Sequence, residues 1–471
     1  MRLGALIGGD DGPVVTGFAI DHRKVAPGTI FGAFRGTRFD GESFIPQAVA
    51  AGAVAVVARA GVKVEGAAHV AAADPRRAFA ELAAKFFAPF PETVVAVTGT
   101  NGKTSTVELT RQIWRMAGYH AASIGTLGVT TADDQVTTGL TTPDVVTFLA
   151  AATGLRREGV THLAFEASSH GLDQYRTHGL PVAAGAFTNL SRDHLDYHGT
   201  MEAYLEAKLR LFSETVSDGG AAVVWADDPA SARVIDVAAG RDLRLITVGQ
   251  QGETLRLTAR EPTQLGQTLT ITAEGKSHRV NLPLIGAYQA ANALTAAGLV
   301  VATGGTTEAT LKALERVQPV RGRLERAAIT RSGAPVYVDY AHTPDGLDAA
   351  IAALRPHTTR RLIVVFGAGG DRDRGKRPEM GAIAVAKADL AIVTDDNPRS
   401  EAPAAIRAEI LAAAPGAREI GDRRAAIAAA IAEAGPGDIV LLAGKGHEQG
   451  QIVGDAVLPF DDVQVARECA A

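Results

Sequence analysis

The chain has 471 residues, of which 46% are hydrophobic and 21% charged, and its formal net charge at pH 7 is -5. This length is too great for one core, and at about 150 residues per domain it predicts roughly three domains. The composition is ordinary for a soluble globular protein, and no lysine or arginine run suggests a nucleic-acid surface. The single cysteine, Cys469, excludes an intrachain disulfide.

Neither a signal peptide nor a membrane span is predicted. Residues 1–9 carry too short an apolar run for a secretory signal, and acidic residues follow directly. The most apolar windows, such as 48–58, are rich in alanine and glycine and too short to cross a bilayer. We therefore expect a cytoplasmic protein without membrane insertion.

The first 90 residues predict a small α/β domain. Two short strands are expected on either side of the turn at 26–28, and Val54 to Val57 predicts a buried strand. Pro89-Phe-Pro91 follows as a linker to the next domain.

The stretch 94–106 has the organisation of a phosphate-binding loop. Its apolar run, Val94 to Val97, predicts a buried strand, Gly99 and Gly102 interrupt it, and a helical pattern is established by Val107. A strand, glycine loop and helix present backbone N–H groups and a helix N-terminus to an anion.

Two side chains sharpen this prediction. Lys103 offers a positive charge to phosphates, and the Thr104 hydroxyl can bind Mg²⁺. The loop is shorter than the common P-loop, because Val97 stands where that pattern has its first glycine. The alternative is a tight turn with a solvated lysine; the coincidence of all features favours a nucleoside triphosphate.

Glu166 follows a strand predicted over 161–165. In open α/β sheets ligands bind outside the carboxyl ends of the strands, so Glu166 is placed where a phosphate-bound magnesium would lie. A turn residue or helix-dipole partner is the alternative, and both interpretations remain open.

His194 and His198 are four residues apart, a possible metal-ligand spacing on a helix. Gly199 follows at once and no acidic third ligand stands at a standard spacing, so a zinc hydrolase is disfavoured. One histidine near a magnesium site is the preferred interpretation.

Lys208 lies on the apolar stripe of a helix whose predicted N-cap is Thr200. The simplest interpretation is a snorkelling lysine with its ammonium in water. A desolvated lysine would instead shift toward the neutral amine, which can react with CO₂ to give a carbamate.

Residues 243–285 alternate apolar and polar side chains, as expected of a β-rich insertion, and a long alanine-rich helix begins at Gly286. Asn292 lies within this helix. An amide inside a helix is more often solvated than functional, and this alternative remains open.

From about residue 319 a strand and helix pattern restarts. Four buried strands are expected, over 336–339, 362–366, 390–394 and 439–442, with helices between most of them. This alternation predicts a doubly wound parallel sheet. Residues 367–372 imitate a dinucleotide fingerprint, but Arg372 replaces its third glycine, and we reject an NAD site.

Polar loops follow three of these strands: Gly369–Arg372, Asp396–Arg399 and Gly444–Glu448. They place guanidinium groups and a carboxylate on one rim of the sheet, which suits a ligand that bears both a carboxylate and an amine.

Together these motifs resemble the Mur ligases, the ATP-dependent amide-bond ligases of peptidoglycan synthesis. The resemblance covers essentially the whole chain. The matching motifs are Gly99–Thr104, Glu166–His170, Asp193–His198, Glu206–Lys208, Gly322–Glu325 and Asp339–His342.

The resemblance implies three α/β domains: a small UDP-binding domain over 1–90, a central P-loop ATPase-type parallel sheet that binds ATP over 91–318, and an amino-acid-binding Rossmann-like sheet over 319–471. It also implies the ligands of ATP and magnesium. ATP would be held by Gly99, Thr100, Asn101, Gly102, Lys103, Thr104, Ser105, Asn292, Arg323, Asp339 and His342. Magnesium would be held by Thr104, Glu166, His194 and a carbamylated Lys208 (N6-carboxylysine).

The same resemblance implies two further substrates, a UDP-muramoyl dipeptide and meso-diaminopimelate. The dipeptide-linked nucleotide would be held by His22, Thr37, Arg38, Phe39, Thr141, Thr142, Ser168, Gln174 and Arg176. Diaminopimelate would be held by Arg372, Asp396, Asn397, Pro398, Arg399, Gly444 and Glu448. Arg399 would pair with its distal carboxylate. Gln289 departs from the pattern, since many relatives have asparagine there.

The resemblance implies a peptide-forming ligase that turns ATP into ADP through an acyl phosphate. Lys103, Glu166, His194, Lys208 and Arg323 would carry catalysis, and a monomer is expected. Two alternatives stay open. A sister ligase adding L-lysine or a dipeptide would share the ATP machinery, and a nucleotide-gated binding module would lack ligase chemistry.

Overall fold

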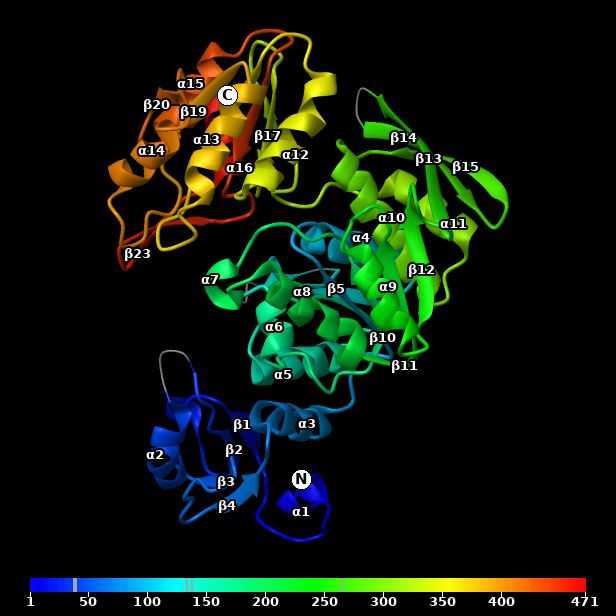
Figure 1. The fold of residues 1–471 in the computed structure, drawn as a ribbon, viewed down its shortest axis with the longest axis vertical. Coiled ribbons are helices and arrows are strands. Elements are labelled where there is room, and N and C mark those ends of the chain that lie inside the picture. Colours follow the sequence, from blue (N-terminus) through cyan, green and yellow to red (C-terminus); the bar gives the residue numbers. More distant parts are fainter. Residues whose placement is uncertain (37–39, 133, 137–138, 264–265) are drawn as a thin grey trace.

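The computed structural model describes residues 1–36, 40–132, 134–136, 139–263 and 266–471. Three α/β units follow one another along the long axis of the molecule, from the N-terminal unit at one end to the C-terminal unit at the other (Figure 1). The predicted three-domain α/β organisation is confirmed. No helix within the described residues is both long and apolar enough to span a bilayer.

The N-terminal unit is built on a parallel sheet in the order β1-β2-β3-β4. Its elements are α1 (Leu3–Ile7), β1 (Gly17–Ala19), β2 (Thr29–Gly32), α2 (Ile45–Ala50), β3 (Ala53–Ala58), β4 (Ala68–Ala71) and α3 (Pro75–Phe87). Phe79 of α3 is buried in the same apolar cluster as Phe148 of the central unit. This shared core joins the first two units.

The central sheet runs β15-β14-β13-β12-β11-β10-β5-β9-β6-β7-β8. Its strands are β5 (Thr93–Thr98), β6 (Ala121–Gly125), β7 (Gly128–Thr130), β8 (Gln135–Val136), β9 (His162–Glu166), β10 (Val182–Phe187), β11 (Val216–Trp225), β12 (Arg244–Gly249), β13 (Leu255–Thr263), β14 (Gly266–Ala273) and β15 (Lys276–Leu282). The strands from β13 to β6 are parallel, and antiparallel strands extend both edges.

Helices cover both faces of this sheet because its central strands are apolar on both sides. They are α4 (Lys103–Met116), α5 (Val145–Arg157), α6 (Ser169–Asp173), α7 (Leu195–His198), α8 (Met201–Arg210), α9 (Ser231–Ala239), α10 (Ala287–Ala302) and α11 (Thr307–Ala313). Trp114 of α4 and Leu294 of α10 share one core, and Leu149 of α5 and Leu205 of α8 share the other.

The third unit has the sheet order β16-β17-β21-β18-β19-β20, parallel except for β16. Its elements are β16 (Glu325–Ile329), β17 (Pro335–Asp339), α12 (Pro344–Leu354), β18 (Leu362–Phe366), α13 (Lys376–Lys387), β19 (Leu390–Val393), α14 (Pro403–Leu411), β20 (Arg418–Glu419), α15 (Arg423–Glu433), β21 (Ile439–Ala443), β22 (Gly450–Val453), β23 (Ala456–Pro459) and α16 (Asp462–Ala470). All four predicted strands are present, and β16 and β20 extend the sheet beyond them.

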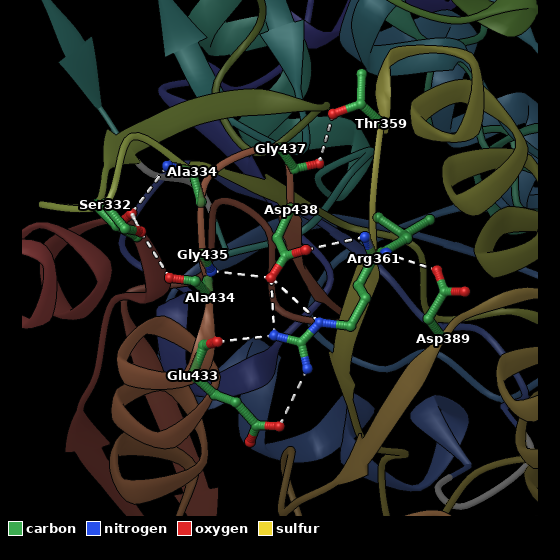
Figure 2. Close-up of polar contacts among 12 residues, drawn as sticks. Ser332, Ala334, Thr359, Arg361, Asp389, Glu433, Ala434, Gly435, Gly437 and Asp438 are labelled. Atoms are coloured by element: carbon green, nitrogen blue, oxygen red, sulfur yellow. Dashed lines mark hydrogen bonds and ion pairs between the residues drawn. The ribbon is translucent and has the colours of Figure 1, made fainter.

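An ion-pair network ties together the amino ends of β18 and β21 (Figure 2). The Arg361 guanidinium donates to the fully buried Asp438 carboxylate at 2.8 Å, and the Gly435 N–H donates to the same carboxylate at 2.9 Å. The side chain of Asp438 therefore caps the chain reversal that precedes β21. The polar rim loops lie at the opposite, carboxyl ends of these strands.

Candidate active site between the central and third domains

The phosphate loop leaves β5 between two parallel neighbours, β9 and β10. The loops after those neighbours therefore meet it at one edge of the sheet. Gly102 has φ +86, and a Cβ there would collide with the Asn292 side chain of α10. Asn292 is 4% exposed, so the solvated-amide alternative is wrong.

Lys103, the first residue of α4, turns back over the loop. Its Nζ donates to the carbonyl oxygens of Thr100 at 2.8 Å and Gly99 at 3.0 Å. Burial lowers the pKa of Lys103, and the nearby carboxylates of Glu166 and Asp193 oppose that effect. The alternative of a freely solvated lysine is wrong, because loop carbonyls hold the ammonium group beside the helix N-terminus.

Glu166 is the last residue of β9 and is 2% exposed. The Thr126 N–H donates to its Oε1 at 2.7 Å, and the Thr126 hydroxyl donates to its Oε2 at 3.1 Å. Burial raises the pKa of Glu166, and Lys103 partly offsets this. A buried carboxylate held at a strand end beside the phosphate loop is a suitable ligand for a hard cation, which a surface turn residue would not be.

Lys208 is 1% exposed, so the snorkelling alternative is wrong. Its Nζ donates to the Gly99 carbonyl oxygen at 2.7 Å and lies 4.2 Å from the centre of the Tyr204 ring. Burial lowers the pKa of Lys208 well below its usual value, and the neighbouring charge of Lys103 adds to this effect. The side chain thus reaches the phosphate loop in an environment that favours a neutral amine.

His194 and His198 do not share the face of one regular helix. His194 precedes α7 with φ +53, and His198 is the last residue of that helix. His194 Nε2 lies 3.4 Å from Asp193 Oδ2, whereas His198 Nε2 lies 3.0 Å from the Ser169 hydroxyl. Within the part of the chain that the structure describes, no three His, Cys, Asp or Glu residues cluster as a metal site.

The third domain contributes Arg323, whose Nη2 donates to the Thr104 hydroxyl at 3.2 Å. The guanidinium lies 4.6 Å from the centre of the Tyr340 ring, and Gln289 of α10 donates to the Arg323 carbonyl oxygen at 3.0 Å. Gln289, the departure from the family pattern, therefore helps to hold Arg323 at the domain boundary.

Asp339 and His342 lie on the same boundary. The Asp339 carboxylate accepts hydrogen bonds from the Leu324 N–H at 2.7 Å and from the Tyr288 hydroxyl of α10 at 3.1 Å. Burial raises the pKa of Asp339 and lowers that of His342. Asp339 therefore joins the end of β17 both to the turn that carries Arg323 and to the central domain.

The residues predicted to hold the muramoyl dipeptide form one connected group. The Thr142 hydroxyl donates to the Glu166 carbonyl oxygen at 2.8 Å and accepts from the Ser168 N–H at 3.1 Å. Arg176 donates to the Thr142 carbonyl oxygen and to Gln174 Oε1, each at 2.8 Å. The Thr126 hydroxyl, which also donates to Glu166, lies at hydrogen-bond distance from the Thr141 hydroxyl, 3.1 Å away. This group therefore adjoins Glu166 directly.

Four residues within the first 90 were predicted to hold the uridine end of the substrate: His22, Thr37, Arg38 and Phe39. The His22 ring stacks on Phe44, with 4.3 Å between ring centres and 4° between ring planes. Thr37, Arg38 and Phe39 lie outside the described residues.

The loops that were predicted to hold the amino acid also lie close together in the structure. Arg399 has φ +52, and its Nη1 donates to the Gly370 carbonyl oxygen at 2.8 Å. The Gly370 N–H donates to the Asn397 carbonyl oxygen at 2.9 Å, which holds the loop of Arg372 against the loop of Arg399. Pro398 lies on the same contact, because a Cβ at Gly370 would collide with its carbonyl oxygen.

The third rim loop, Gly444–Glu448, packs equally closely against the loop Asp396–Arg399. A Cβ at Gly444 would lie 2.7 Å from Asp396 Oδ2, and Glu448 Oε2 accepts a hydrogen bond from Asn397 Nδ2 at 2.8 Å. Several residues that hold the site were not predicted: Thr126, Asn189, Tyr288, Tyr340, Lys445 and His447. Only the last three lie in motifs that the sequence had singled out.

Three family profiles cover most of the chain. The Mur ligase family catalytic domain matches residues 14–97, the Mur ligase middle domain matches 97–300, and the Mur ligase glutamate ligase domain matches 322–446. A relative from Zymomonas mobilis is 62% identical over an alignment of 458 residues that covers 96% of this chain and 94% of the relative. The chain belongs to the Mur ligase family.

That relative is named UDP-N-acetylmuramoyl-L-alanyl-D-glutamate–2,6-diaminopimelate ligase, as is a relative from Caulobacter vibrioides. The latter is 54% identical, over 96% of this Mur ligase and 94% of the relative. A solved structure with the same name has a TM-score of 0.73 and 32% identity, covering 100% of this Mur ligase and 98% of that chain.

A more distant solved structure, MurF ligase from Thermotoga maritima in complex with ADP, has a TM-score of 0.62 at 19% identity. The alignment covers 92% of this Mur ligase and 94% of that chain. At this identity the match shows the shared fold.

Proposed function

We propose that this Mur ligase joins meso-diaminopimelate to UDP-N-acetylmuramoyl-L-alanyl-D-glutamate and converts ATP to ADP and phosphate. The observation that carries the proposal is the rim of the third domain. There Arg399 and Glu448 both contact Asn397, through its backbone oxygen at 3.5 Å and its side-chain nitrogen at 2.8 Å respectively. A guanidinium and a carboxylate so placed suit the distal carboxylate and the ammonium of diaminopimelate.

The central domain supplies the complementary half of the reaction. Lys103, Lys208 and Arg323 gather around the phosphate loop, with Glu166 among them. The positive charges of Lys103 and Arg323 at a helix N-terminus favour the triphosphate of ATP. The remaining loop residues, together with Asn292, Asp339 and His342, would complete the nucleotide site from both sides of the domain boundary.

In the proposed reaction the γ-carboxylate of D-glutamate attacks the γ-phosphorus of ATP, and ADP leaves. The neutral diaminopimelate amine then attacks the carbonyl carbon of the resulting acyl phosphate, the nitrogen loses a proton to solvent, and phosphate departs from the tetrahedral intermediate. Lys103 and Arg323 stabilise the negative charge that moves during both steps. Because the two substrates are held by different domains, positioning by domain closure contributes much of the rate.

A magnesium ion fits the donors present. Glu166 and Thr104 offer hard oxygen atoms beside the phosphate loop, and His194 lies near Lys103. Magnesium commonly takes one or two carboxylates and completes its shell with substrate phosphates and water, so a cluster of three protein acids is not required. When bound, the ion would neutralise phosphate charge during transfer.

Lys208 is proposed to be carbamylated. Its buried amine, held at the Gly99 carbonyl, would become a carboxylate facing the same loop. Conversion of the amine to an anion would place a negative charge beside the cations of Lys103 and Arg323, which gives the modification an electrostatic advantage at this position.

The three domains would divide the work, with the UDP end of the substrate on residues 1–90, ATP on 91–318 and diaminopimelate on 319–471. The muramoyl dipeptide would lie along Thr141, Thr142, Ser168, Gln174 and Arg176. We further propose that the enzyme acts as a monomer in the cytoplasm, where ATP is available.

A phosphate-release assay tests the function. Purified protein is given ATP, magnesium and the UDP-muramoyl dipeptide, with meso-diaminopimelate, L-lysine or D-alanyl-D-alanine offered in turn. Release should depend on diaminopimelate. Preference for L-lysine or the dipeptide would identify a sister ligase, and release without any amino acid would contradict ligase chemistry.

Lys103→Ala provides the matched mutational test. It should abolish phosphate release, whereas Lys312→Ala, which changes an exposed lysine in the last turn of α11, should not. Near-normal turnover in the Lys103 variant would contradict the assigned site.

A further inference from the structure

Lys445 is a buried cation in the rim loop that carries Glu448. Its side chain is fully buried, and its Nζ donates to Glu448 Oε2 at 2.9 Å and to Asn397 Oδ1 at 3.1 Å. Both acceptors belong to side chains that the proposed function gives to diaminopimelate. The role of Lys445 itself is not accounted for by that function.

Two glycines bring Lys445 into this position. Gly444 and Gly446 flank it with φ +113 and +55, backbone angles that L side chains rarely adopt. A Cβ on Gly446 would lie 2.6 Å from the Tyr340 Cβ, and one on Gly444 would lie 2.7 Å from Asp396 Oδ2. The loop is thus packed against β17 and the Asp396 loop so closely that the lysine between the glycines is enclosed.

The contacts of Lys445 fix the orientation of the Asn397 amide. Asn397 Oδ1 accepts from Lys445 and also from the Ile452 N–H at 2.9 Å, so the other amide atom, Nδ2, faces Glu448. Both groups then donate to Glu448 Oε2. Among the described residues no donor contacts Oε1 of Glu448, and this oxygen remains for a ligand.

We propose that Lys445 is a positioning residue of the amino-acid site, which orients Glu448 and Asn397 to receive the ammonium of diaminopimelate. The proposal rests on the proposed function. Without the lysine, Glu448, whose side chain is 28% exposed, would lose its ion pair and one of the two donors that fix Oε2. Binding of diaminopimelate would then include the free-energy cost of ordering the Glu448 carboxylate.

The first test is Lys445→Met, which keeps the length of the side chain and removes the ammonium. KM for diaminopimelate should rise on the order of tenfold to a hundredfold, the range expected for a lost hydrogen bond to a charged group. KM for ATP and for the muramoyl dipeptide should stay within about twofold of the wild-type values, since their proposed ligands do not contact Lys445.

Arg361→Met is the matched control. It removes the cation of another ion pair in the same domain, but at the amino ends of β18 and β21, away from the rim (Figure 2). This variant should lower thermal stability and leave KM for diaminopimelate unchanged. An equal rise of that KM in both variants would show that Lys445 acts only through the stability of the domain, and would overturn the proposal.

A double-mutant cycle separates positioning from general damage. If Lys445 acts through Glu448, adding Lys445→Met to Glu448→Gln should raise KM for diaminopimelate by less than about threefold. Full additivity would overturn the proposal. Should the methionine variant fail to fold, Lys445→Gln carries the same test, because its amide retains donors but has no charge.

The two proposals fail in different ways. If wild-type protein releases no phosphate with diaminopimelate, the proposed function fails. If wild-type protein is active and the Lys445 variants keep the wild-type KM for diaminopimelate, the function stands and the positioning role of Lys445 is overturned.

Discussion

Arg323 Nη2 donates a hydrogen bond of 3.2 Å to the Thr104 hydroxyl, so a guanidinium of the third domain contacts the phosphate loop of the central domain. Gln289 holds the Arg323 backbone from the central side, and Asp339 holds the adjacent Leu324 N–H from the third domain. The proposed site for phosphoryl transfer is therefore built from both domains.

Replacing Arg323 with alanine should lower kcat for phosphate release on the order of a hundredfold to a thousandfold, because a charge that stabilises the transferring phosphoryl group is lost. Single-turnover kinetics with saturating substrates measure this. Arg321→Ala is the control, since Arg321 pairs with Asp461 at 2.6 Å and not with the loop. Equal effects of the two substitutions would contradict the role of Arg323.

Lys208→Ala should reduce activity strongly, and short carboxylates such as acetate or formate should restore part of it by replacing the carbamate. The wild-type enzyme should lose activity when CO₂ is removed. Burial lowers the pKa of Lys208 and so favours the neutral amine, the form that reacts with CO₂. Activity of the alanine variant that equals wild type, or that no carboxylate affects, would contradict carbamylation.

Arg399→Ala should raise KM for meso-diaminopimelate on the order of a hundredfold, because the distal carboxylate would lose its charged partner. L-lysine has no such carboxylate, so the low activity with L-lysine should change little. The ratio of activity with meso-diaminopimelate to activity with L-lysine should therefore fall. Competition assays measure this ratio. Arg424→Ala, in which a half-exposed arginine loses its pairing with Glu468, should leave the ratio unchanged.

Acid should destabilise the protein partly through His447. Burial and the adjacent Arg323 lower the pKa of His447 from 6.5 to about 3. As pH falls from 6.5 toward 3, the unfolded chain binds a proton at this residue that the folded chain does not, so the free energy of unfolding decreases.

The variant His447→Gln should therefore lose less stability than wild type between pH 7 and pH 5, by about 1 kcal/mol after allowance for partial exposure. Urea unfolding at both pH values measures this difference. Identical pH dependence in the two proteins would show that His447 titrates normally in the folded state.

Local pattern predicted the parts of the site that depend on one strand and the loop after it. The apolar run before Gly99 became β5, and Glu166 stands at the end of β9, as the sequence indicated. Strand, loop and helix are specified by residues close together in the chain, and parallel strands bring their carboxyl ends to one edge without further information.

The surroundings of individual side chains could not be obtained in this way. The position of Lys208 on an apolar stripe favoured a snorkelling lysine over a buried one, because the sequence does not show what packs on that stripe. The Gly99 carbonyl that its Nζ contacts comes from a loop 109 positions away. Asn292 presented the same ambiguity, because its neighbour Gly102 lies in a different element.

By itself, then, the sequence determined the α/β class, the phosphate loop and the charged rim loops, because each of these depends on residues that are close together in the chain. The tertiary structure alone decided that Lys208 is buried, that Arg323 contacts Thr104 and that Lys445 holds Glu448 and Asn397 together. Burial and charge pairing depend on which distant segments pack together, and that is a property of the folded chain.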